Sequence, residues 1–305
     1  MDLTQIAQEV LAFVAAEGIE LSSDKLRLCQ HLSRHSLPTL PTTRFDVFAK
    51  GVDYPFPIVV KPRDGAGSVN TFLIRDAGEL RALQAELAAR LEGRALLTPS
   101  PSPARGEGGR GRALAPVANA ARGDSEAVVQ PFVPGRPLST AALIDDADGR
   151  IEVLPVGEQR LTSDGRFGYR GGRIPAIDLP PELASAAVDL VTEACRSVPG
   201  LAGFVGFDLI ASPEPPHVRI VEINPRLTTS YVGYRRLTRE NLAARMLGLV
   251  GSKLAKRALA HQFVGTVAGK VPVSNTWWAS AHFASSAHPT IEFVEFDADG
   301  TVRVS

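Results

Sequence analysis

The segment Val218–Arg226, which reads VRIVEINPR, is the most informative part of this 305-residue chain. Side chains of an extended strand alternate between its two faces, so Glu222, Asn224 and Arg226 are expected to share one face. The apolar residues that alternate with them, Val221 and Ile223, are then expected to point into a core. The strand is also expected to end here, because a proline at position 225 cannot donate a hydrogen bond to a sheet.

A second apolar run, Gly206–Ile210, places the carboxylate of Asp208 between Phe207 and Leu209. Burying a carboxylate is costly unless it is paired or bound to a metal. Polar residues that alternate along a strand most often form a solvated sheet face, which is the alternative interpretation. The apolar surroundings of Asp208 and the abrupt strand end favour a site. Two carboxylates, an amide and a guanidinium on paired strands suit Mg²⁺ and the phosphates of a nucleotide.

The string Glu222-x-Asn224-Pro225-Arg226, preceded by Gly206-x-Asp208, resembles the metal-binding end of the ATP-grasp superfamily of carboxylate–amine ligases. The resemblance extends from about Ser23 to about Leu249. The longer string EINPRLTTSY, which starts at Glu222, is most similar to the tyramine–L-glutamate ligase family of methanofuran synthesis. The resemblance implies an α/β fold in which two α+β lobes clasp ATP.

Three segments follow from the resemblance: a truncated N-terminal helical segment (1–50), a small lobe (51–133) and a large lobe with the metal site (134–305). ATP-grasp ligases usually carry an α/β domain before the stretch that matches residues 22–25. That domain is expected to be short or missing here. The start of the sequence could be misplaced, the domain could be truncated, or a partner could supply it. Within the small lobe, residues 98–125 are rich in Pro, Gly and Arg and are expected to be a disordered insertion. Contact of its arginines with RNA or a phosphate is the alternative.

Periodicity and turn residues predict the remaining elements. Helices are expected over 4–16, from a cap at Ser23, from a capping box at Asp76 to about Gly93, over 181–197 and over about 239–249. Strands are expected over 57–62, 71–74, 127–135, 138–144 and 151–161, with a hairpin over 290–304.

Lys61 ends a buried strand and precedes a glycine-containing turn. A lysine there can reach phosphates, while backbone N–H groups of the turn fold over them. An exposed lysine beside a plain hairpin turn is the alternative. The turn lacks the terminal Gly-Lys-Ser/Thr of a Walker A loop. The resemblance implies that ATP is bound by Lys61, a second lysine and the turn, that is by Lys25, Lys61, Gly65, Ala66, Gly67 and Ser68.

The resemblance also places an interlobe hinge at Gln130–Val133. It implies that the Gln130 side chain contacts the adenine region, that Phe132 belongs to the same ATP-binding segment, and that the Val133 N–H reaches adenine N1. The family often has glutamate where this chain has Pro131, which removes one donor.

Asp208, Glu222 and Asn224 are the ligands that the resemblance implies for Mg²⁺ or Mn²⁺, with two ions bridged by Glu222. Arg226 is implied as the catalytic residue that binds the γ-phosphate and the acyl phosphate; a salt bridge to Glu222 is its alternative role. The candidates for substrate binding are Arg160, Arg173, Thr229, Ser230, Tyr231 and Arg235. An exposed helix position is the alternative for Arg235.

The implied reaction is a two-step ligation through an acyl phosphate, joining the γ-carboxylate of L-glutamate to tyramine or a related amine. A ligase for another amino-acid or peptide pair and a catalytically silent nucleotide-binding subunit are the alternatives. The small-molecule partners are an acid and an amine, and a homodimer is possible for this class.

Composition excludes several other classes. Lys+Arg and Asp+Glu are 33 each, so no global field attracts nucleic acid or a membrane surface. Cys29 and Cys195 lie in apolar helical patterns and are expected as buried free thiols, with a disulfide as the alternative. No run reaches the length of a membrane span, and a cytoplasmic location is expected.

Overall fold

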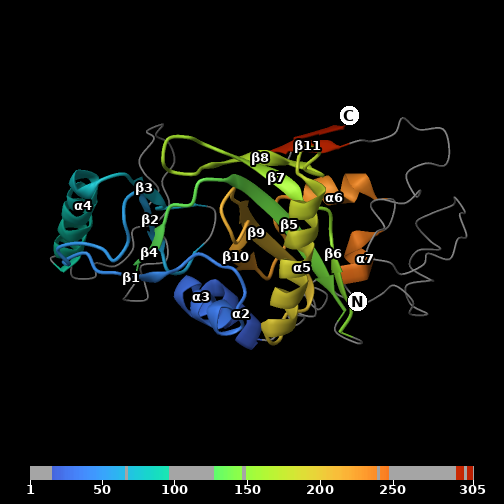
Figure 1. The fold of residues 1–305 in the computed structure, drawn as a ribbon, viewed down its shortest axis with the longest axis horizontal. Coiled ribbons are helices and arrows are strands. Elements are labelled where there is room, and N and C mark those ends of the chain that lie inside the picture. Colours follow the sequence, from blue (N-terminus) through green and yellow to red (C-terminus); the bar gives the residue numbers. More distant parts are fainter. Residues whose placement is uncertain are drawn as a thin grey trace, which may run out of the picture.

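The computed structural model describes residues 16–65, 68–95, 127–145, 149–238, 241–246, 293–298 and 301–304. Two antiparallel sheets with helices packed against them form these parts of the chain (Figure 1). Ala16 aside, the helix expected over 4–16 lies outside the described residues, as does the insertion expected over 98–125.

A four-stranded sheet forms the small lobe together with one helix. Its strand order is β1 (Thr43–Phe45), β4 (Ala127–Pro131), β2 (Ile58–Pro62) and β3 (Phe72–Ile74), with neighbours antiparallel. The helix α4 (Ala77–Ala95) packs Leu80 and Leu83 against Ile58, Val60 and Ile74 of the sheet. The strands predicted over 57–62 and 71–74 are therefore confirmed as β2 and β3, which are slightly shorter. Strand β1 joins this sheet from within the first fifty residues.

The first turn of α4 has the predicted capping box. The Asp76 Oδ1 accepts hydrogen bonds from the N–H groups of Gly78 and Glu79 at 2.7 and 2.9 Å. The Glu79 carboxylate reaches back and accepts the Arg75 N–H at 2.7 Å. These contacts satisfy donors that a helix start leaves free. The helix extends to Ala95, two residues beyond Gly93, near which its end was predicted.

The large lobe is built on an eight-stranded sheet. Its order is β10 (Val218–Asn224), β9 (Gly203–Ala211), β5 (Arg136–Ile144), β7 (Gly157–Leu161), β8 (Tyr169–Ile174), β11 (Val294–Asp297) and β12 (Val302–Val304), with β6 (Ile151–Val153) also paired to β5. The single strand predicted over 151–161 is two strands, β6 and β7. Pro155 lies in the break between them, where it cannot donate to a ladder. Strand β8 was not predicted, whereas the hairpin of β11 and β12 was.

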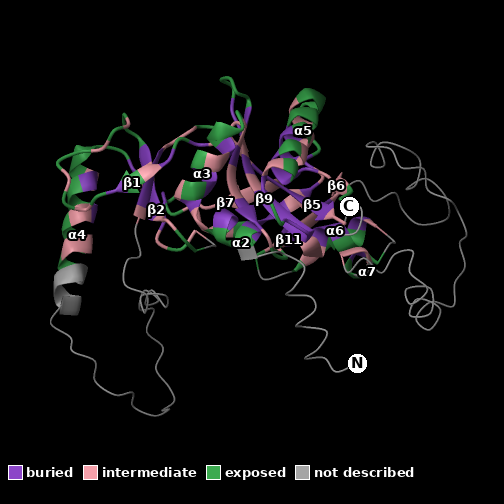
Figure 2. Cartoon of the chain, turned by 90° about the horizontal axis from the view of Figure 1, so that it is seen from below, coloured by how far each residue is buried: buried purple, intermediate pink, exposed green. Residues whose placement is uncertain are grey.

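Helix α5 (Pro181–Ser197) covers one face of the large sheet and has the predicted bounds, with proline in its first turn (Figure 1). Its buried residues Ala187 and Val191 belong to one core with Phe207 and Leu209 of β9. Helices α2 (Ala16–Ser23) and α3 (Lys25–Arg34) contribute to the same core. In Figure 2 buried residues follow the sheet, while exposed residues cover the outer side of α5.

Ser23 was predicted to cap the second helix, and this was wrong by one residue. Ser23 ends α2, and Asp24 caps α3 by accepting the N–H groups of Leu26 and Arg27, both at 3.0 Å. An aspartate cap uses its carboxylate where serine would use a hydroxyl.

The other face of the large sheet packs against α6 (Tyr231–Leu237) and α7 (Leu242–Met246). Phe204 of β9 belongs to this second core with Tyr234 of α6 and Phe296 of β11. Helix α7 lies within the helix predicted over about 239–249, whereas α6 was not predicted.

Cys29 and Cys195 are both buried and unpaired, as predicted. None of the helices in the described ranges combines the length and the apolar composition needed to cross a membrane.

Candidate functional site

A cavity of about 700 Å³ lies between the two sheets and collects most of the predicted site residues. Strands β2 and β4 line it from the small lobe, and β5, β7, β9 and β10 line it from the large lobe. On β9, Phe207 and Leu209 belong to the core shared with α5, while Asp208 between them belongs to the cavity wall. The cavity therefore uses the sheet face opposite α5.

A β-bulge places two carboxylates opposite each other. Glu222 of β10 pairs with Asp208 of β9, and the register shifts between Ile220 and Glu222. Because Val221 is the extra residue, Ile220 and Ile223 both pack in the core beneath α5. Val221 lines the cavity instead, so its predicted place in the core was wrong, whereas that of Ile223 was confirmed.

Both carboxylate oxygens of Asp208 accept amide hydrogen bonds. Gln159 Nε2 donates to Oδ1 at 2.7 Å, and Asn224 Nδ2 donates to Oδ2 at 3.2 Å. Burial and, to a smaller extent, the Glu222 charge raise the pKa of Asp208 to about 6, even though the two amides and Arg226 act in the opposite direction. Asp208 and Glu222 thus form a carboxylate pair in which each negative charge disfavours ionisation of the other.

Arg226 lies at the end of β10, against Asn224. Its guanidinium donates to Asn224 Oδ1 at 3.0 Å and to the Leu227 carbonyl at 3.2 Å. The ion pair of Glu222 is with Lys25 instead. Arg226 is exposed and lines the cavity, so its guanidinium can meet an anion there.

Two buried lysines face Glu222. The Lys25 ammonium lies 3.6 Å from Glu222 Oε1 and donates to the Gly65 carbonyl at 2.8 Å. Burial lowers the pKa of Lys61 to about 8, a shift that Glu222 opposes and that the Lys25 charge increases. Both lysines are 8% exposed, so their charges are little screened by water and act strongly on an anion in the cavity.

The start of α3 is fixed to the strand that carries Lys61. Arg63 binds the Asp24 carboxylate through two nitrogens at 2.9 and 2.7 Å, and the Lys25 N–H donates to the Arg63 carbonyl at 3.0 Å. Lys25 is therefore held beside the turn. Gly65 has a φ of +104°, which favours glycine. Gly65 and Ser68 line the cavity, whereas Ala66 and Gly67 lie outside the described residues.

The predicted hinge lines the same cavity through Gln130, Phe132 and Val133. The buried Gln130 side chain donates to Thr42 Oγ1 at 2.7 Å. The Phe132 N–H donates to the Pro57 carbonyl at 3.0 Å. The Phe132 ring stacks on Phe167 from the loop between β7 and β8, with ring centres 6.2 Å apart.

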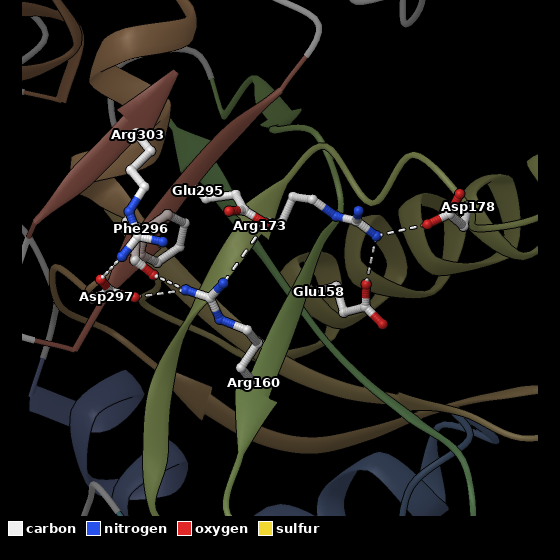
Figure 3. Close-up of polar contacts among 8 residues, drawn as sticks. All are labelled: Glu158, Arg160, Arg173, Asp178, Glu295, Phe296, Asp297 and Arg303. Atoms are coloured by element: carbon white, nitrogen blue, oxygen red, sulfur yellow. Dashed lines mark hydrogen bonds and ion pairs between the residues drawn. The ribbon is translucent and has the colours of Figure 1, made fainter. Parts of the chain in front are cut away.

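Arg160 and Arg173 lie on the opposite face of the sheet from Gln159 and form ion pairs outside the cavity (Figure 3). Arg160 donates to Asp297 at 2.8 Å and to the Phe296 carbonyl at 3.1 Å. Arg173 binds Glu158 at 3.1 Å and Asp178 at 2.8 Å. The structure therefore does not bring these two arginines to the other predicted residues.

The remaining candidates for substrate binding lie partly in the cavity wall and partly outside it. Thr229 and Ser230 line the cavity. Tyr231 starts α6 and packs edge-on against Phe204, with ring centres 5.9 Å apart. Arg235 is exposed on α6, and neither it nor Tyr231 lines the cavity.

Sequence reasoning missed Gln159, Phe167 and Tyr169, which all line the cavity. Burial raises the pKa of Tyr169, and the Asp208 charge raises it further. A cue for Gln159 was present: it is the uncharged polar residue between Glu158 and Arg160 on a strand. Its neighbours' side chains lie on the other face, so Gln159 alone points to the cavity.

The oxygen atoms in the cavity wall would fit a magnesium ion if a bound phosphate ligand and water completed its coordination. Among the described residues, no three His, Cys, Asp or Glu side chains cluster as a metal site. The cavity offers two carboxylates and the Asn224 amide, which are hard oxygen donors. Mg²⁺ is commonly held by one or two carboxylates plus substrate phosphates and water. The carboxylate pair of Asp208 and Glu222 also carries the negative charge that a divalent cation would neutralise.

The fold and the cavity define a two-lobed protein with a polar site between two antiparallel sheets. A family model described as an ATP-grasp domain matches residues 102–230. A solved structure with this architecture is the biotin carboxylase domain of 2-oxoglutarate carboxylase from Hydrogenobacter thermophilus. It has a TM-score of 0.56 and 19% sequence identity, covering 77% of this chain and 46% of that one. The chain therefore has the ATP-grasp fold, and residues 102–230 are similar in sequence to the ATP-grasp domain.

Two curated relatives are ligases. Tyramine–L-glutamate ligase of Methanocaldococcus fervens is 30% identical over 112 residues, which are 37% of this chain and 34% of the relative. D-alanine–D-alanine ligase of Acidiphilium cryptum is 26% identical over 179 residues, which are 59% of this chain and 48% of the relative. The matches thus span between a third and a half of each relative's length.

Proposed function

We propose that this protein is an ADP-forming ligase that joins a carboxylate to an amine. The observation that carries the proposal is the meeting of Lys25, Lys61, Asp208, Glu222 and Arg226 in one cavity between the two lobes. Cationic groups beside a pair of carboxylates suit a nucleotide triphosphate with a divalent cation. The ligase names of both relatives support the same class of reaction.

The residues divide into two groups by chemistry. Asp208, Glu222 and Asn224 would hold Mg²⁺ or Mn²⁺, and two ions would fit a site completed by phosphate oxygens. The cation would neutralise charge on the β- and γ-phosphates. Lys61 and Lys25 would bind the phosphates directly, and the turn that contains Gly65 would cover them.

The adenine would lie against the hinge formed by residues 130–133, where the cavity wall includes Phe132 and Phe167. Stacked aromatic rings present an apolar surface suited to a base. Because Gln130 already donates to Thr42, the Gln130 amide oxygen is the group that would meet the exocyclic amine of adenine.

In the first step a substrate carboxylate oxygen attacks the γ-phosphorus, and the bond from that phosphorus to the β–γ bridging oxygen breaks. The products are an acyl phosphate and ADP. In the second step the amine nitrogen attacks the acyl carbon, phosphate leaves with its oxygen, and the nitrogen loses a proton. Arg226 would stabilise the charge on the transferred phosphoryl group, and the cavity would hold the reactants together.

L-glutamate and tyramine are the substrate pair that we propose, because the string EINPRLTTSY resembles that ligase family and one curated relative bears that name. A second pair follows from the other relative, whose name specifies D-alanine and D-alanine. Thr229 and Ser230 follow β10 and line the cavity, and they would contact the acid or the amine.

The test is ADP release from Mg·ATP with purified protein, measured for L-glutamate plus tyramine and for D-alanine alone. Products are identified by mass spectrometry, and Glu222→Ala is the inactive control. Release of ADP that needs both substrates, with an amide of the expected mass, would support the proposed pair. Binding of ATP without ADP release for any pair would contradict the ligase activity and favour a silent nucleotide-binding subunit.

A further inference from the structure

Gln159 makes a contact across the large sheet that the proposed chemistry has not used. It lies on β7, whereas its partner Asp208 lies on β9, and β5 runs between these strands. The contact is short, at 2.7 Å from Nε2 to Oδ1. A side chain that crosses an intervening strand to reach a carboxylate needs a reason in packing.

The register of the three strands shows how the contact forms. Ser139 of β5 pairs with Asp208 on one side and with Gly157 of β7 on the other. Alternate strands lie about 10 Å apart, so two side chains must lean together over the strand between them. Gln159 lies two residues beyond Gly157 on β7, so its side chain reaches Asp208 diagonally across β5. Ser139, the direct partner of Asp208, is a small residue and lines the same cavity.

The two amides that bind Asp208 act on different oxygens. Gln159 donates to Oδ1, while Asn224 donates to Oδ2 from the neighbouring strand β10. An amide N–H orients a carboxylate without cancelling its charge, because the amide is neutral. Asp208 is therefore fixed in rotation while its negative charge stays available to a cation.

We infer that Gln159 is a positioning residue that orients the Asp208 carboxylate toward a divalent cation in the cavity. The inference rests on the proposed function, since it assigns Asp208 as a ligand. Hydrogen-bonding partners of metal ligands typically change metal affinity by about 10- to 100-fold when they are removed. Gln159 differs from a purely structural residue because its amide meets a charged group in the cavity wall rather than a backbone group.

The experiment measures Mn²⁺ binding to the full chain in the presence of ADP, by isothermal titration and by electron paramagnetic resonance of the bound ion. Gln159→Met keeps the side-chain length and removes the donor. We expect about a tenfold or greater loss of Mn²⁺ affinity and a changed resonance line shape. The melting temperature of the ligand-free variant should stay within a few degrees of the wild type.

Gln84→Met is the matched control. Gln84 also donates an amide hydrogen bond, to the Ala49 carbonyl at 2.9 Å, but it lies outside the cavity. This variant should bind Mn²⁺ with wild-type affinity and line shape. Gln159→Asn is the second variant, and it covers the case in which methionine disturbs folding. It keeps an amide but is one methylene too short for the bridge, so it should lose affinity as Gln159→Met does.

The outcomes separate the inference from the proposed function. Wild-type Mn²⁺ affinity in a folded Gln159 variant, with an unchanged line shape, would overturn the positioning role while leaving the ligase proposal standing. Wild-type protein that binds no Mn²⁺ with ADP would overturn the proposed function, and the inference with it. Loss of affinity in the Gln159 variants but not in Gln84→Met would support the inference.

Discussion

Asp208 and Glu222 are direct partners across β9 and β10, and both line the cavity because Val221 is an extra residue in β10. Without the bulge, strict alternation would put Glu222 on the same face as Ile220, inside the core beneath α5. The bulge therefore turns Glu222 to the face that Asp208 occupies. Nothing else in the described sheet brings two carboxylates together in the cavity wall.

Metal binding should depend on pH through Asp208. Its pKa is raised to about 6, so the carboxylate is largely protonated below that pH and cannot bind a cation. We expect Mn²⁺ affinity with ADP to be constant above about pH 7 and to fall by up to about tenfold per unit below pH 6. Titration of Mn²⁺ between pH 5 and pH 8 measures this dependence, and an affinity that is flat from pH 5 to pH 7 would contradict it.

The stability of the ligand-free protein should also depend on Asp208, but in the opposite direction: it should fall as pH rises. The folded-state pKa of about 6 exceeds the ordinary aspartate pKa of 3.8, so between these pH values the folded state binds more protons than the unfolded state. The stability present below pH 4 is therefore lost as pH rises through 6. Relative to Asp208→Asn, the wild type should lose on the order of 2 kcal/mol between pH 4 and pH 7. Urea unfolding of both proteins at several pH values measures it; a gain instead of a loss would contradict the argument.

Single deletions in β10 test the bulge. Deleting Val221 restores regular pairing and keeps Glu222 opposite Asp208, so the variant should fold, with a melting temperature lower by a few degrees. Deleting Ile223 removes a core side chain that is 1% exposed and moves Asn224 to the core face, and the variant should not fold. Circular dichroism melts of the two proteins provide the comparison. Equal melting temperatures would show that the register has no special role.

The attachment of α3 to β2 should matter for both stability and phosphate binding. Asp24→Ala removes the helix cap and the two bonds to Arg63, and should cost about 1–3 kcal/mol. ADP affinity should also fall, because Lys25 follows Asp24 directly. Asp76→Ala, which removes the cap of α4 away from the cavity, is the control: it should reduce stability while leaving ADP affinity unchanged. Denaturant unfolding and calorimetric ADP titrations of both variants would decide; equal ADP affinities would contradict the role of Asp24.

The local elements of this fold were largely predictable, because their signals are short-range. Helix α5 was predicted from its proline start and apolar period, and its bounds agree with the structure. The capping box at Asp76 and the strand that ends at Lys61 are also local patterns. The cap of α3 was placed one residue early because serine and aspartate are nearly equal as caps, so the sequence offered two adjacent choices.

The features that were missed depend on contacts distant in sequence. The bulge at Val221 arises from pairing with β9, and no residue in β10 is of a type that predicts a bulge. Gln159 becomes a site residue only because the fold brings Asp208, two strands away, within reach of its amide. Arg160 and Arg173 looked suited to a substrate carboxylate, but their strand faces direct them to acidic partners outside the cavity.

The measurement that tests the central claim most directly is calorimetric binding of ADP with and without Mg²⁺, for the wild type and for Glu222→Gln. The substitution keeps the shape of the side chain and removes its charge. The account predicts that Mg²⁺ strengthens ADP binding to the wild type about tenfold or more and that Glu222→Gln loses this enhancement while still binding ADP through the lysines. Equal enhancement in both proteins would contradict the placement of the metal site at Asp208 and Glu222.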